Sequence, residues 1–173
     1  MFPQRHPPPI ATKSAYRLRK LRRSAGLIVW AGSAALVLAI RPASPIMPLL
    51  LVLLAPPVLA SGVPLLVEAW REHRAARAAR PYVRTAAQAL LRLNGDAALQ
   101  ALYQALAVTH LGPPALGPVI HNVGTALVLT GQREAGQEWI ARARASGWVT
   151  PRAIREGERL LRELTQGGGR PGA

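Results

Sequence analysis

The chain has 173 residues, half of them hydrophobic, with 22 Lys and Arg against 8 Asp and Glu and no cysteine. The lack of cysteine excludes disulfides, thiolate catalysis and cysteine-ligated metal sites. A net charge of +14 often accompanies nucleic-acid binding, but the first 84 residues hold 13 of the basic side chains and only two of the acidic ones. Because this excess flanks apolar segments, anionic lipid explains it more simply, and nucleic acid is an unlikely partner.

Residues 1–24 are predicted to form a Pro-rich and basic cytoplasmic tail. The first 12 residues contain four prolines and no apolar periodicity, so they should be extended or disordered. Residues 13–24 are basic, with Tyr16, Leu18 and Leu21 interleaved. That pattern predicts a short helix lying on a membrane surface.

The next stretch, residues 25–67, is predicted to form a transmembrane hairpin with spans at about 25–41 and 46–67. The first uncharged run has 16 residues, and as a helix it would rise about 24 Å, slightly less than a bilayer core requires. The second run has 22 uncharged residues and four prolines, so it should be kinked or broken at Pro56-Pro57. A buried core helix is the alternative for each run, but a chain of this length has little core in which to hide two of them.

The basic residues around these runs predict the orientation of the hairpin. Seven precede the first run, Arg41 lies in the connection, and five closely follow the second run. The positive-inside rule then places both termini in the cytoplasm. The composition, rich in Ala, Arg, Leu and Pro, is typical of a G+C-rich bacterial genome, so the membrane is expected to be a bacterial inner membrane. Contacts with lipid headgroups are expected from Arg17, Arg19, Lys20, Arg22, Arg23, Arg71 and Arg74.

The remaining chain should be helical. Residues 68–81 are strong helix formers and predict a basic juxtamembrane helix that Pro81 ends. Residues 82–165 have sparse charges, periodic apolar residues and regular glycines, which predict a small soluble domain. Its five helices are expected at about 82–93, 96–108, 118–130, 133–145 and 151–164. Residues 166–173, with three consecutive glycines, should be a flexible tail, and the fold class is all-α.

One helix, glycine turn and helix in this domain carry a recognisable pattern. Its signature residues are Ile120, Val123, Gly124, Leu127, Gly131, Gly136, Ile140 and Ala143. This spacing resembles the tetratricopeptide repeat over residues 86–165. Gly124, Gly131 and Ala143 agree directly, whereas Gly136 stands where alanine is usual. A weaker copy is expected at 87–108 with Ala101 and Ala105 as its small positions; an unrelated small helical bundle is the alternative.

The resemblance implies helix pairs stacked in a right-handed manner, with a concave face that receives a peptide or a partner helix, and it implies no chemistry. The four histidines have no metal-ligand spacing with carboxylates, and no phosphate loop or catalytic elbow is present. No enzyme activity, cofactor or metal is therefore expected. The sequence predicts a membrane-anchored scaffold or adaptor that presents its helical domain to an unidentified protein partner. The alternative is an accessory subunit of a larger membrane enzyme or transporter.

Overall fold

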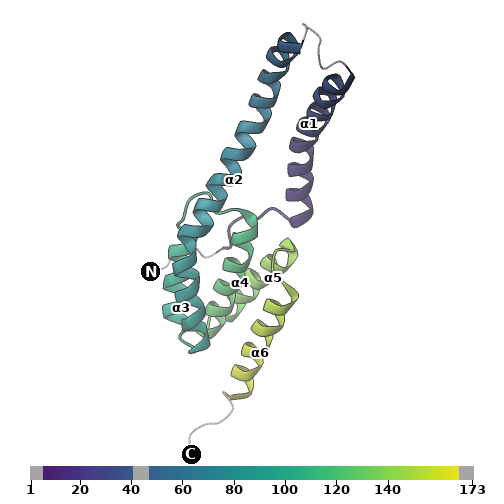
Figure 1. The fold of residues 1–173 in the computed structure, drawn as a ribbon. Coiled ribbons are helices and arrows are strands. Elements are labelled where there is room, and N and C mark those ends of the chain that lie inside the picture. Colours follow the sequence, from purple (N-terminus) through teal and green to yellow (C-terminus); the bar gives the residue numbers. More distant parts are fainter. Residues whose placement is uncertain (1–5, 41–46, 168–173) are drawn as a thin grey trace, which may run out of the picture. The chain divides into compact units, whose positions relative to one another are not determined.

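The computed structural model describes residues 6–40 and 47–167, and every regular element in those ranges is a helix (Figure 1). This confirms the predicted all-α class. The helices are α1 (Lys13–Ile40), α2 (Met47–Leu91), α3 (Gly95–Leu106), α4 (Pro113–Leu129), α5 (Arg133–Ser146) and α6 (Pro151–Gly167). The predicted connection around Arg41 and the end of the predicted flexible tail lie outside the described residues.

The chain divides into two compact units. One is Ser14–Arg71, which holds most of α1 and the first part of α2. The other joins Met1–Lys13 to Glu72–Ala173 and is called the helical domain below. Among the described residues, the helical domain therefore contains 6–13, the second part of α2 and helices α3 to α6.

The predicted transmembrane hairpin is wrong. Within the ranges that the structure describes, no helix combines the length and the apolarity needed to cross a membrane. The first run has only 16 uncharged residues, fewer than the about 20 that a bilayer core requires, and the second run contains four prolines. This finding also contradicts three linked predictions: the spans at 25–41 and 46–67, the multi-pass inner-membrane localisation, and the cytoplasmic placement of both termini.

Two prolines also differ from their predicted roles. Pro81 does not end a helix, because α2 continues through it to Leu91. Ala79 and Ala86 on either side of it are buried in the same core, and this packing offsets the lost backbone hydrogen bond. Helix α4 begins at Pro113, five residues before the predicted start at Pro118. Proline is tolerated in the first turn because the N–H that it lacks would have no hydrogen-bond partner within the helix.

The core of the helical domain is built around α4. This helix packs most extensively against α5, next against α3, and to a smaller extent against α6. Buried alanines of α2 join the same core. The largest fully buried side chains are Trp139, Leu99, Leu102, Ile120, Val119 and Val123, all from α3, α4 and α5. The indole N–H of Trp139 has no hydrogen-bond acceptor among the described residues.

Helices α2 and α4 end in the same type of turn. The N–H of Leu93 donates to the carbonyl oxygen of Leu90 at 3.0 Å, and the N–H of Asn94 donates to that of Ala89 at 2.9 Å. This pair of bonds defines a Schellman cap, whose left-handed residue is Leu93 with φ of 54°.

The end of α4 repeats this geometry with a glycine in the left-handed position. The N–H of Gly131 donates to Val128 at 3.1 Å, the N–H of Gln132 donates to Leu127 at 2.9 Å, and φ at Gly131 is 84°. Helix pairs α2–α3 and α4–α5 are therefore joined by equivalent turns.

These turns put the two helix pairs in register with each other. Counting from the left-handed residue, Ala86 of α2 matches Gly124 of α4, and Ala98 of α3 matches Gly136 of α5. All four residues are buried. The small positions of the first pair are thus Ala86 and Ala98, whereas the sequence pointed to Ala101 and Ala105.

Candidate interaction surface

A short segment that precedes α1 packs on the helical domain. Residues 7–12, called the N-terminal segment below, contain no helix. Pro7 is buried, and Ile10 packs at the rim of the hydrophobic core. The segment has no regular secondary structure, and part of it packs on the domain surface.

Two side chains of the helical domain hold the backbone of this segment. Arg142 of α5 donates from Nη1 to the carbonyl oxygen of Pro7 at 2.9 Å. Trp148, which follows α5, donates from Nε1 to the carbonyl oxygen of Ala11 at 2.9 Å. Because both acceptors are main-chain carbonyls, these bonds fix an extended backbone without reading its side chains.

The end of α5 places Trp148 in this position. Gly147 has φ of 71° and caps the helix in the left-handed conformation, which glycine adopts without strain. The hydroxyl of Ser146 donates to the carbonyl oxygen of Ala143 at 2.6 Å and accepts the N–H of Trp148 at 3.3 Å. The turn after α5 is therefore fixed, and the indole N–H is directed at the segment.

Gly117 on α4 makes room for Trp148 and for Ile10 of the N-terminal segment. A Cβ built on Gly117 would lie 2.6 Å from Cβ of Trp148 and 3.6 Å from Cδ1 of Ile10. The first of these distances is a collision with an atom next to the backbone, which cannot move cheaply. Glycine at this position thus lets Trp148 and Ile10 pack close to α4.

Charged groups contribute little to the docking. Nδ1 of His6 lies 3.6 Å from Oε2 of Glu138, and both side chains are well exposed. The ammonium group of Lys13 lies 6.0 Å from the centroid of the Trp148 ring. Contacts of this kind are worth at most about 1 kcal/mol each on an exposed surface. The two carbonyl hydrogen bonds and the apolar contacts of Pro7 and Ile10 are therefore the main interactions.

The eight residues of the repeat signature lie elsewhere in the domain. All except Gly131 are buried, and Gly131 is exposed in the turn between α4 and α5. Gly124 and Gly136 face each other where α4 crosses α5. The signature therefore holds the two helices together. Its residues are distinct from Arg142, Trp148 and Gly117, which contact the N-terminal segment.

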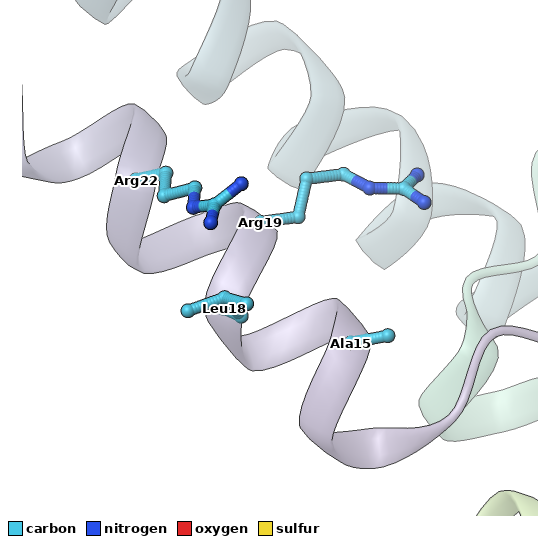
Figure 2. A pocket seen from close by; sticks show the side chains of 4 residues that line it. All are labelled: Ala15, Leu18, Arg19 and Arg22. Atoms are coloured by element: carbon cyan, nitrogen blue, oxygen red, sulfur yellow. The ribbon is translucent and has the colours of Figure 1, made fainter.

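The residues predicted to contact lipid headgroups are exposed where their side chains are described. Arg17, Arg19, Lys20, Arg22, Arg71 and Arg74 are all exposed, and the side chain of Arg23 lies outside the described residues. Lys20 folds back onto Tyr16, with Nζ 3.3 Å from the phenolic oxygen. Figure 2 shows a hollow on α1 whose described lining is Ala15, Leu18, Arg19 and Arg22. Lipid contact at these residues stays a prediction.

One histidine of the helical domain is buried. His121 of α4 is only 3% exposed. Its Cε1 would lie 2.9 Å from a Cβ built on Gly157 of α6. Burial lowers its pKa; the nearby Arg144 also lowers it, while a hydrogen bond with Asn122 and the charge of Glu158 oppose the shift. In the described part of the chain, no three His, Asp or Glu side chains group as a metal site would require.

Comparisons with protein-family models, with curated proteins and with solved structures found no match. No binding role was assigned to Arg142 or Trp148 from the sequence. The one local signal for the site in the sequence is a tryptophan directly after a helix-ending glycine. The segment that it binds lies 137 residues away in the chain, at Ala11.

Proposed function

We propose that this protein is an interaction module whose helical domain binds an extended segment of a partner protein, as a scaffold or adaptor does. The observation that carries this proposal is the pair of side chains, Arg142 and Trp148, that hold an extended backbone by its carbonyl oxygens. An arginine and an indole in fixed positions can hold any extended chain of suitable shape in this way.

The arrangement of the helices supports the same proposal. Two helix pairs end in equivalent Schellman turns and have small buried residues at matching positions. This agrees with the resemblance to tetratricopeptide repeats, in which stacked helix pairs provide a surface for peptides.

The test uses full-length protein in which Ile10→Asp weakens docking of the N-terminal segment, since a carboxylate is unfavourable at the rim of an apolar core. A partner is captured from extracts of the cells that make the protein, and its binding is then measured with purified components. Adding Arg142→Ala and Trp148→Phe removes both carbonyl donors and should weaken binding at least about tenfold.

Arg155→Ala serves as the matched control, because Arg155 is an exposed arginine on α6. This variant should bind the purified partner as tightly as Ile10→Asp alone. If no partner shows the dependence on Arg142 and Trp148, the proposed function is wrong.

A further inference from the structure

We propose that the N-terminal segment is a built-in ligand, which closes the peptide site until a partner segment of the same chemistry displaces it. This inference rests on the proposed function and adds the class of ligand and its regulation. The matching ligand is an extended peptide with the pattern Pro-x-x-Ile, where the isoleucine can be replaced by valine.

The contacts of the segment define this pattern. Pro7 is buried and its carbonyl oxygen accepts from Arg142, so the first position requires an apolar residue in extended conformation. Ile10 packs beside Gly117 at the rim of the core, which favours a branched aliphatic side chain three positions later. Pro9 is exposed between them. The next carbonyl oxygen, at Ala11, accepts from Trp148.

The prolines between these contacts lower the cost of docking. Proline fixes φ near the extended value, so Pro8 and Pro9 have little conformational freedom to lose when the segment binds. A partner peptide rich in proline would have the same advantage. The chemistry of the segment therefore predicts a preference for proline-rich ligands.

The segment can leave without disrupting the helices. The fully buried large side chains all come from α3, α4 and α5, and Ile10 is only partly buried at the edge of that core. The bonds from Arg142 and Trp148 end on carbonyl oxygens that water can satisfy after release. A competing peptide thus replaces each contact with an equivalent one.

The affinity of the domain for an added peptide follows from the fraction of molecules in which the segment is docked. A tethered ligand has an effective concentration on the order of 1 mM, so docking in nine of ten molecules implies a Kd of about 0.1 mM or lower for the same peptide added in trans. When only one molecule in ten is open, the apparent Kd is about tenfold higher than the intrinsic one. Release of the segment should therefore improve binding of an added peptide by about tenfold.

The test measures binding of a fluorescein-labelled synthetic peptide with the sequence of residues 6–13 to full-length protein by fluorescence anisotropy. Ile10→Asp should bind the peptide at least about tenfold more tightly than the parent. A second opened variant, Pro8→Gly with Pro9→Gly, alters no core residue and raises only the entropy cost of docking, so it should bind at least about threefold more tightly than the parent. Circular dichroism verifies that both variants keep the helix content of the parent.

Three controls decide the outcome. Adding Trp148→Phe to Ile10→Asp should weaken peptide binding, whereas adding Arg155→Ala should not. A peptide in which the isoleucine is replaced by aspartate should not bind. Equal affinity of the parent and both opened variants, or no binding to either opened variant, overturns the inference. A partner that depends on Arg142 and Trp148 but binds parent and Ile10→Asp equally would leave the proposed function standing and remove only the built-in ligand.

Discussion

Gly124 of α4 and Gly136 of α5 lie face to face at backbone contact. A Cβ built on Gly124 would stand 2.7 Å from the carbonyl oxygen of Gly136, and one built on Gly136 would stand 2.6 Å from that of Gly124. Neither oxygen is the mobile end of a side chain, so neither can move away without shifting a helix. The packing of α4 on α5 therefore depends on both glycines.

The first prediction concerns Gly136→Ala. Alanine is the usual residue of the repeat at this position, and its helix propensity gains up to about 1 kcal/mol over glycine. Overpacking against the backbone of α4, however, costs about 1–3 kcal/mol. We expect a net loss of about 1–2 kcal/mol and a lower melting temperature by circular dichroism.

Gln137→Ala is the control, since Gln137 is the exposed neighbour of Gly136 on the same helix. It should change stability by less than about 0.5 kcal/mol. If Gly136→Ala melts as high as Gln137→Ala, α4 and α5 do not cross through this glycine.

The second prediction concerns the left-handed leucine that ends the cap of α2. Leu93 has φ of 54° and is 52% exposed, so its Cβ imposes strain of about 1–2 kcal/mol and its burial returns only part of this. Leu93→Gly relieves that strain. Leu91→Gly instead removes an exposed residue from the last helical position and loses helix propensity of about 1 kcal/mol.

Urea unfolding should therefore show that Leu93→Gly is more stable than Leu91→Gly by at least about 1 kcal/mol. Both variants lose a leucine side chain and gain the same glycine flexibility in the unfolded chain, so the comparison isolates the backbone conformation. The opposite order would mean that the exposed leucine is held in place by contacts stronger than the strain.

Local features of the fold were predictable from the sequence because each depends on neighbouring residues. Gly147 ends α5 and Pro151 opens α6, as expected from their backbone preferences. The hydroxyl of Thr150 accepts the N–H of Ala153 at 3.3 Å, as an N-cap should. The start of α3 was predicted one residue late: the helix begins at Gly95, and Asn94 caps it by accepting the N–H of Ala97 at 3.1 Å.

Contacts between distant residues were not predictable in this way. Arg142 and Pro7 are 135 positions apart, and no periodicity in the chain relates them. Glu158 of α6 likewise forms an ion pair with Arg144 of α5, 14 positions away, at 2.8 Å. The interaction surface consists of such contacts, so it emerged only when the folded chain brought α5 and the N-terminal segment together.

The third prediction is a loss of stability at acidic pH that depends on His121. Burial holds its pKa in the folded protein below the usual value of 6.5, whereas the unfolded chain titrates near that value. Between the two pKa values the unfolded state binds more protons, so stability is complete above about pH 6.5 and falls as the pH drops through this window.

Urea unfolding at pH 7.5 and pH 5 measures this effect. The parent should lose more stability between the two conditions than His121→Gln, in which the titrating group is absent. His73→Gln, at an exposed histidine of α2, should behave as the parent does. If His121→Gln and the parent lose equal stability, the acid sensitivity arises elsewhere.

The last prediction traps the N-terminal segment on the domain. Cβ of Lys13 lies 3.6 Å from the position that a Cβ on Gly147 would take, within the range of about 3.5–4.5 Å found across disulfides. The chain has no cysteine of its own, so Lys13→Cys with Gly147→Cys introduces the only two thiols. Mild oxidation should convert nearly all of this variant to an intramolecular disulfide, visible as faster migration on a non-reducing gel.

Lys13→Cys with Gly131→Cys provides a matched control. Gly131 also has a left-handed backbone, so a cysteine there carries the same kind of strain, but apart from its chain neighbours no described residue lies within 4 Å of its Cβ position. This pair should stay reduced under the same oxidation. Equal cross-linking of both pairs would show that the segment moves freely over the domain, and failure of the Gly147 pair alone would place the segment away from the end of α5. The expected result requires the docked position in which Trp148 reaches the carbonyl oxygen of Ala11.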